Sequence, residues 1–266
     1  MTASDAHAPA PSDAADDPTI GGGDIRLGSY LFTMIEPHAG HEVAYNRWYE
    51  RDHFYAGCMI GPWLFAGARF VATRDLKAMR IGDEPDLFGD HPGATLSLYW
   101  VLDGKRAEHF DWGSRQVRWL YANDRMFPQR EHVHTNLYSH RSTAARDPDG
   151  TPIEVALDRR YRTLVCAWIE RHDREWPADP DLTGGVTELV ERSHPAPMPD
   201  DAPLDQKRLD NIRNRQLTLW FSDAEPQAVM DQVAVWGESI RDTGRLLWAG
   251  PFTPTVPGTD TYMDQL

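Results

Sequence analysis

Histidines that follow carboxylates at short spacing are the residues of this chain best suited to proton transfer. Glu36-Pro37-His38 closes an apolar run, and Glu50-Arg51-Asp52-His53 closes a helical pattern. A neutral imidazole can accept and return a proton near pH 7, which suits enolisation, isomerisation or aldol-type cyclisation. We therefore predict His53 as a catalytic base, with Glu36, His38 or Tyr49 orienting it or stabilising an enolate.

The same residues also have a purely structural interpretation. His53 is expected at the C-terminal end of its helix, where the helix macrodipole favours the protonated imidazole. It could then cap the helix or bond a neighbouring carboxylate, and Glu36 and His38 could form a solvated turn. Both interpretations stay open on the sequence.

A second group of histidines alternates with apolar residues. His132, His134, Asn136, Tyr138 and His140 are spaced by two, so they share one face if this stretch is a strand. A polar face turned inward would bind a substrate or a metal, and a face turned to solvent would do neither. We predict His132, His134 and Tyr138 as substrate-binding residues. No metal is predicted, because the chain lacks a fixed-spacing signature such as H-E-x-x-H.

Aromatic residues could form an apolar pocket beside these histidines. Trp48, Tyr49, Tyr99 and Trp100 would suit a planar ligand, although residues of this kind also build ordinary cores. The chain has no P-loop and no G-x-G-x-x-G motif, and the G-x-S-x-G motif of serine hydrolases is absent. The sequence therefore predicts small-molecule chemistry without an organic cofactor.

Three patterns occur twice in the chain in the same order. Ile35-Glu36-Pro37-His38 is echoed by Ile169-Glu170-Arg171-His172, Glu50-Arg51-Asp52-His53 by Glu191-Arg192-Ser193-His194, and Leu96-Ser97-Leu98-Tyr99-Trp100 by Leu217-Thr218-Leu219-Trp220-Phe221. The offsets are 134, 141 and 121 residues. This conserved order indicates one small α+β unit that is duplicated within the chain.

Apolar periodicity predicts a β-α-β-β-α-β order for the first unit. Its strands are expected at 29–36, 64–73, 95–102 and 132–140, and its helices begin at His41 and Lys105. In the second unit, strands are expected at 161–170, 216–222 and 246–252. A helix is expected around Leu182, Val186 and Leu189, ended by His194-Pro195, and another begins at Glu225-Pro226. The second strand of this unit cannot be identified between 195 and 215.

Composition restricts the possible partners. The net charge of -14 disfavours nucleic acids and anionic membranes, which bind through an excess of Lys and Arg. No apolar run approaches the ~20 residues needed to span a bilayer. Residues 1–25 are expected to be disordered and lack the features of a signal peptide. The two cysteines are predicted to be reduced thiols in the core. A cytoplasmic location is therefore predicted.

The segment Tyr45-Asn46-Arg47-Trp48-Tyr49-Glu50-Arg51-Asp52-His53 resembles the first-helix signature "NxWY(D/E)xxH" of dimeric α/β-barrel proteins. These include EthD-like proteins, muconolactone isomerase-like enzymes, polyketide cyclases and antibiotic-biosynthesis monooxygenases. In the second unit only Glu191, Arg192 and His194 match. The resemblance implies two ferredoxin-like units packed sheet on sheet, usually as a homodimer, and the duplication implies that one chain forms the barrel. The first unit is then expected to hold the working pocket.

The predicted fold class is α+β, with two tandem ferredoxin-like β-α-β-β-α-β units forming an intrachain dimeric α/β barrel. The predicted organisation is a disordered segment at 1–25, a first unit at 26–142, a linker at 143–160 and a degenerate second unit at 161–266. The predicted function is a cofactor-independent isomerase, lyase or cyclase acting on a hydrophobic, aromatic or polyketide-like small molecule. The alternatives are a monooxygenase or a haem- or metal-binding member of the same superfamily, or a non-catalytic ligand-binding protein. A further homodimer is possible.

Overall fold

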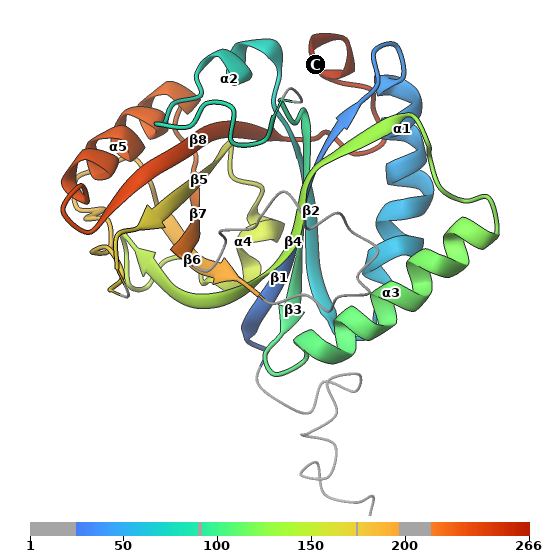
Figure 1. The fold of residues 1–266 in the computed structure, drawn as a ribbon, viewed down its shortest axis with the longest axis horizontal. Coiled ribbons are helices and arrows are strands. Elements are labelled where there is room, and N and C mark those ends of the chain that lie inside the picture. The colour runs from blue at the N-terminus through green and yellow to red at the C-terminus, as the bar shows by residue number, and fades with distance from the viewer. Residues whose placement is uncertain (1–24, 90–91, 174, 197–213) are drawn as a thin grey trace, which may run out of the picture.

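The computed structural model describes residues 25–89, 92–173, 175–196 and 214–266. The strands of this part close into one antiparallel barrel in the order β1-β3-β2-β8-β5-β7-β6-β4 (Figure 1). Each half of the chain supplies four neighbouring strands, and the halves join where β2 pairs with β8 and β4 pairs with β6. The predicted fold class is therefore confirmed. The predicted disorder at 1–25 falls almost entirely outside the described residues.

The first unit supplies β1 (Leu27–Pro37), β2 (Leu64–Val71), β3 (Thr95–Leu102) and β4 (Arg130–Ala145). The second supplies β5 (Thr163–Arg171), β6 (Leu189–Pro195), β7 (Arg215–Ser222) and β8 (Gly244–Pro254). The sequence pattern that 96–100 and 217–221 share lies in β3 and β7, the third strand of each unit. Strand β4 continues past His140 to Ala145, because its last residues pair with β6 of the other unit.

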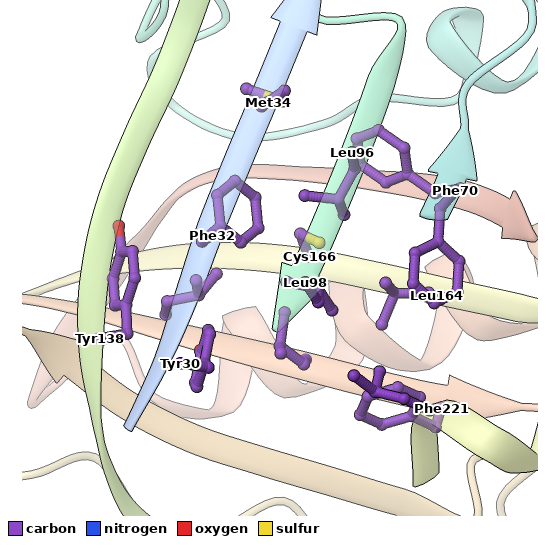
Figure 2. Close-up of a cluster of buried hydrophobic side chains, with 14 of the residues drawn as sticks. Tyr30, Phe32, Met34, Phe70, Leu96, Leu98, Tyr138, Leu164, Cys166 and Phe221 are labelled. Atoms are coloured by element: carbon purple, nitrogen blue, oxygen red, sulfur yellow. The ribbon is translucent and has the colours of Figure 1, made fainter. Parts of the chain in front are cut away.

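Buried hydrophobic side chains pack the barrel interior. Tyr30, Phe32 and Met34 alternate along β1 and are fully buried, together with Leu98 of β3 and Phe221 of β7 (Figure 2). Burying each such side chain stabilises the fold by about 1.5–3 kcal/mol. Because strand residues alternate between faces, the intervening residues of β1 point out of the barrel, toward the helices.

Helices cover the outer face of each half of the barrel (Figure 1). In the first unit these are α1 (Glu42–Trp48), the π-helix η3 (Tyr49–Met59) that continues it, and α3 (Arg106–Ala122). In the second unit α5 (Pro226–Ser239) buries Val229, Val233 and Trp236 against outward-facing residues of β5 and β7. The remaining short helices are α2 (Arg74–Ala78), η4 (Ile153–Val155), α4 (Ala156–Arg159) and η7 (Met263–Gln265). No helix in the described residues is long and apolar enough to cross a membrane.

The predicted first helix of the second unit is wrong. The described residues between β5 and β6 contain no helix, and the Glu191-Arg192-Ser193-His194 echo lies in strand β6. That strand is the one that the sequence did not reveal. The misleading feature is Glu191, which is buried inside the barrel although it carries a carboxyl group. It accepts hydrogen bonds from the Tyr30 hydroxyl and from His140, partners that come from the first unit.

Candidate functional site

A cavity of about 360 Å³ lies outside the barrel, between the first unit's sheet and its helices η3 and α3. Its floor is formed by outward-facing residues of β1, including Leu31, Thr33 and Ile35. Its polar walls contain imidazole, hydroxyl, guanidinium and carboxyl groups. They include Tyr49, His53, Tyr99, His109, Ser114, Arg130, Glu131 and His132. A concave, largely apolar site with a few convergent polar groups is the usual form of a small-molecule site.

The π-helical turns of η3 determine which side chains reach the cavity. Tyr49, His53 and Cys58 all line it. Tyr49 and Cys58 are nine residues apart, which is two and a half turns of an α-helix and would place them on opposite sides. The wider i→i+5 turns of a π-helix make the same separation about two turns. The cavity therefore depends on the helix type, and π-helical segments are frequent at functional sites.

His53 is held by aromatic rings on two sides. Its ring stacks on Trp48, with centroids 4.5 Å apart, and meets Tyr49 edge-on at 5.3 Å. Gly57 leaves room for the imidazole, because a Cβ at this position would lie only 2.6 Å from the His53 Cε1 atom. The Nδ1 atom of His53 is buried and has no hydrogen-bond partner among the described residues. The ring is therefore fixed in place and keeps one nitrogen for a ligand.

The electrostatic surroundings of His53 differ from the expectation. Burial, followed by the charges of Arg130 and His132, lowers the pKa of His53 to about 3. The macrodipole argument for a protonated ring was wrong because His53 lies in the middle of η3 rather than at a helix end. At pH 7 the imidazole is neutral and can donate or accept a hydrogen bond.

Two phenols and a thiol lie deep in the same site. The hydroxyl groups of Tyr49 and Tyr99 are 2.7 Å apart, and both side chains are buried. Burial raises the pKa of each phenol and raises the pKa of the Cys58 thiol to about 12. All three groups are therefore neutral at pH 7. They can donate hydrogen bonds but do not supply an anionic nucleophile.

His132 and His134 do not share a face, so that prediction was wrong. The register of β4 against β1 shifts by one residue between them: Met34 pairs with His134, and Ile35 pairs with His132. This β-bulge reverses the alternation of side chains. His132 lines the cavity beside Arg130, and burial lowers its pKa to about 4.

His134 borders the cavity, but its ring belongs to the barrel interior. It lies 5.6 Å from the rings of Phe32 and Trp168 and shares a 2.7 Å hydrogen bond with the Tyr138 hydroxyl. Burial lowers the pKa of His134 to about 3. Tyr138 itself faces the core and accepts a hydrogen bond from the Trp168 indole, so its assignment as a substrate-binding residue is corrected.

Other predicted site residues lie away from this cavity. Glu36 pairs with Lys77 at 3.5 Å, and His38 is exposed and pairs with Glu131 at 3.0 Å. Trp100 points into the barrel, where its indole donates to the Ile153 carbonyl. Trp48 acts through its stack on His53, and it does not line the cavity. Of the four predicted catalytic residues, the structure brings together Tyr49 and His53.

The sequence interpretation missed His109 and Arg130. His109 lies on α3, is buried, and has a pKa lowered to about 4 by burial. It lies four and eight residues before Gly113 and Val117, which also line the cavity, so helical periodicity could have indicated it. Arg130 is the first residue of β4, and its guanidinium lies 5.0 Å from the centre of the Trp48 ring. No local pattern marks Arg130, because its neighbour Trp48 comes from α1, far away in the sequence.

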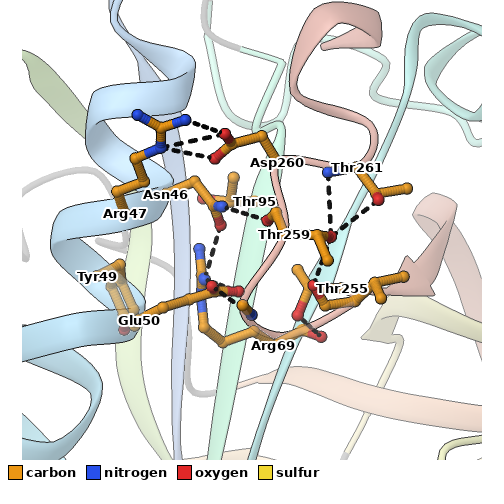
Figure 3. A network of polar contacts seen from close by, with 12 residues as sticks. Asn46, Arg47, Tyr49, Glu50, Arg69, Thr95, Thr255, Thr259, Asp260 and Thr261 are labelled. Atoms are coloured by element: carbon orange, nitrogen blue, oxygen red, sulfur yellow. Dashed lines mark hydrogen bonds and ion pairs between the residues drawn. The ribbon is translucent and has the colours of Figure 1, made fainter.

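A buried polar network anchors the start of η3 to the sheet (Figure 3). Arg69 of β2 donates to the Asn46 side chain at 2.9 Å, pairs with Glu50 at 3.2 Å, and lies 4.5 Å from the Tyr49 ring centre. Asn46 in turn donates to the Thr259 carbonyl of the C-terminal segment. This network positions Tyr49 and the rest of η3 over the sheet.

The described residues contain no group of three or more His, Cys, Asp or Glu side chains that could hold a metal ion. Cys58 and Cys166 are both buried free thiols, as predicted.

Comparison with solved structures places this fold among known ones. A putative chlorite dismutase, TA0507, matches 91% of this chain and 100% of its own with a TM-score of 0.52, at 10% sequence identity. An anthrone oxidase-like protein matches 87% of this chain and 92% of its own at 9% identity, with a TM-score of 0.49. No protein-family model and no curated protein sequence matches the chain. At these identities the likeness concerns the fold alone.

Fold and cavity together define the class of protein. The chain has the dimeric α/β-barrel fold, and both ferredoxin-like halves come from one polypeptide. The predicted resemblance is confirmed at the level of fold. In the described parts of the two halves the helices differ: η3 and α3 of the first half border an outer-face cavity lined by histidines, and the described second half has α5 alone over its sheet.

Proposed function

We propose that this protein is an enzyme that performs acid–base chemistry, without an organic cofactor, on a hydrophobic aromatic or polyketide-like small molecule. The observation that carries this proposal is the cavity under η3 and α3, where neutral imidazoles, phenols and the guanidinium of Arg130 converge on a largely apolar space. An isomerase, lyase or cyclase would use these groups to remove and return a proton at carbon.

His53 and Arg130 have complementary roles in this proposal. A neutral imidazole with an unpaired Nδ1 can accept a proton from an acidic C–H group beside a carbonyl. The low pKa of His53 makes it a weak base in the empty cavity. The enolate formed by proton transfer would raise the pKa of His53 again, because a nearby negative charge favours the imidazolium. Arg130 would in turn stabilise the enolate. The charge that lowers the pKa of His53 therefore also stabilises the product of the transfer.

The dimensions of the cavity favour a compact substrate. Its volume of about 360 Å³ is near the lower end of the usual range for small-molecule sites, roughly 300–1,000 Å³. Apolar floor residues such as Leu31 and Ile35 suit an aromatic ring system of two or three fused rings. Tyr49 and Tyr99 can donate to a carbonyl or hydroxyl oxygen on such a ring.

Hydrogen–deuterium exchange tests the proposal without knowledge of the natural product. The protein would be incubated in D₂O with 2-tetralone, a bicyclic ketone with acidic C–H groups, and exchange would be followed by NMR. We expect accelerated exchange by the wild type and a loss of at least about a hundredfold in His53→Ala, the range of general-base effects. The matched control His172→Ala removes an exposed histidine of the second unit and should exchange as the wild type does. Equal rates in all three proteins would refute His53 as the base.

Two alternatives are tested separately. A monooxygenase or haem protein of this superfamily is the first, and the fold shared with a putative chlorite dismutase agrees with it as well as with the proposed enzyme. A visible haem band in the purified protein, or on addition of haem, would favour this alternative over the proposed enzyme. A non-catalytic binding protein, the second alternative, would have the same cavity and the same lining groups. It would bind the ketone without accelerating exchange, so the same assay separates the two. The predicted cytoplasmic location and homodimer stay predictions.

A further inference from the structure

A buried imidazole in the cavity takes no part in the proton transfer proposed above. His109 lies in the first turn of α3 and is 4% exposed. Its side chain lines the cavity, and its Nδ1 atom is buried without a hydrogen-bond partner among the described residues. Buried polar atoms of protein side chains are in large majority hydrogen-bonded. An imidazole that lines a cavity and lacks a partner therefore indicates a polar group on the ligand.

The first turn of α3 lies over the N-terminal end of β1. Arg106 donates to the Ser139 hydroxyl at 3.0 Å, and Ser139 is the register partner of Ser29 on β1. His109 follows Arg106 by one helical turn. Its imidazole therefore belongs to the end of the cavity floor that Leu31 forms.

His53 lies toward the other end of this floor. Its ring stacks on Trp48, and the centre of the Trp48 ring lies 5.0 Å from the guanidinium of Arg130. Arg130 is the register partner of Pro37, six residues beyond Leu31 on β1. Six residues of a strand span roughly 20 Å. Long side chains shorten this separation, but the two imidazoles still lie toward opposite ends of the cavity.

The surroundings of His109 are apolar and leave open space. Burial lowers the pKa of His109 to about 4, and no charged group of the described residues contributes to this shift. The ring lies beside Trp112, with centroids 6.2 Å apart. A Cβ added at Gly113, which also lines the cavity, would meet nothing within 4 Å. This end of the cavity therefore suits a neutral polar group on a ligand better than an anion.

A hydroxyl group fits this imidazole better than a carbonyl group does. A neutral imidazole donates through one nitrogen and accepts through the other, and a hydroxyl group can answer either, whereas a carbonyl can only accept. The hydroxyl groups of Tyr49 and Tyr99 already bond each other at 2.7 Å. His109 is thus the buried group of the cavity wall best placed to recognise a second oxygen on the ligand.

We propose that His109 binds a hydroxyl group at the end of the substrate remote from the carbonyl that reacts at His53. The substrate class is then a hydroxylated bicyclic aromatic ketone, which has an oxygen substituent at each end of an elongated apolar ring system. This assignment rests on the proposed function, which places the reacting carbonyl at His53. A site built to hydrogen-bond a hydroxyl group discriminates against the analogue that lacks it.

Calorimetry would compare the binding of 2-tetralone and 6-hydroxy-2-tetralone to the full-length protein. Position 6 lies at the opposite end of the ring system from the carbonyl carbon. We expect the wild type to bind the hydroxylated ketone about tenfold more tightly, the effect of one hydrogen bond in a buried site.

Two variants of His109 test whether this preference comes from the imidazole. His109→Phe keeps a flat ring and removes both nitrogen atoms, so it should bind the two ketones with about equal affinity. His109→Asn places an amide near the position of Nδ1 and should keep part of the preference. The control His172→Ala removes an exposed histidine of the second unit and should keep all of it. Circular dichroism would show that the variants are folded.

The results separate this assignment from the proposed function. Deuterium exchange that depends on His53, with the same ratio of affinities in the wild type and His109→Phe, would overturn the role of His109 alone. A preference that is lost in His109→Phe, without any acceleration of exchange, would refute the enzyme and leave the hydroxyl site in a binding protein. The assignment of His109 is also overturned if the wild type binds neither ketone or binds both equally.

Discussion

Protonation of His134 in the barrel core should make the protein sensitive to mild acid. His134 is 4% exposed, and burial followed by the charge of Arg215 lowers its pKa to about 3. In the unfolded chain a histidine has a pKa of about 6.5. The unfolded state therefore binds the proton more readily, so stability is complete above pH 6.5 and falls as the pH falls toward 3.

The size of this effect follows from the two pKa values. At pH 5 the unfolded histidine is almost fully protonated and the folded one is almost fully neutral. The resulting loss of unfolding free energy between pH 7 and pH 5 is about 2 kcal/mol for this one residue. The result changes little if the folded pKa is 4 instead of 3, because His134 is neutral at pH 5 in either case.

Urea unfolding at pH 7, 6 and 5 would measure the effect in the wild type and in His134→Gln. Glutamine keeps a group that can bond the Tyr138 hydroxyl but does not titrate. We expect the stability of the variant to fall by about 2 kcal/mol less over this range than that of the wild type. The control His172→Gln removes an exposed histidine and should keep the wild-type slope. An unchanged slope in His134→Gln would show that the ring is already protonated or solvated in the folded protein.

Three further changes probe the core, the network and the site. Phe32→Ala should lower the unfolding free energy by about 3–5 kcal/mol, because it empties part of the packed barrel interior, and chemical denaturation would measure this. Arg69→Met should cost about 3 kcal/mol, since the largely buried Glu50 loses its ion-pair partner and keeps a hydrogen bond from the Gly258 backbone N–H, and a loss below 1 kcal/mol would contradict the structure. Gly57→Ala should displace the His53 ring and reduce deuterium exchange as strongly as His53→Ala does, while the protein stays folded by circular dichroism.

The local pattern of the sequence was sufficient for several elements. Strand β3 begins and ends at the predicted residues, and α3 and α5 begin within a residue or so of their predicted starts. These elements carry uniform apolar periodicity with turn residues at their ends, so short-range preferences and the final environment agree. The duplication of the unit was also visible, because β1 and β5, and β3 and β7, repeat a similar residue pattern.

The functional site depended more on tertiary contacts. His53 and Tyr49 were predicted from a motif, and the structure places both in one cavity. The low pKa of His53 could not be predicted, because it results from burial and from Arg130, which is supplied by a distant strand. Similarly, the bulge that separates His132 from His134 is a feature of the pairing between β4 and β1.

By itself, the sequence determined the α+β class, the tandem repeat and the presence of a histidine in the first helical segment. Only the tertiary structure decided that Glu191 lies in a buried strand, that the barrel interior is solid, and that the cavity lies outside it. The physical reason is that a polar residue is buried only where partners satisfy it. For Glu191 those partners are Tyr30 and His140, which the fold brings from the other half of the chain.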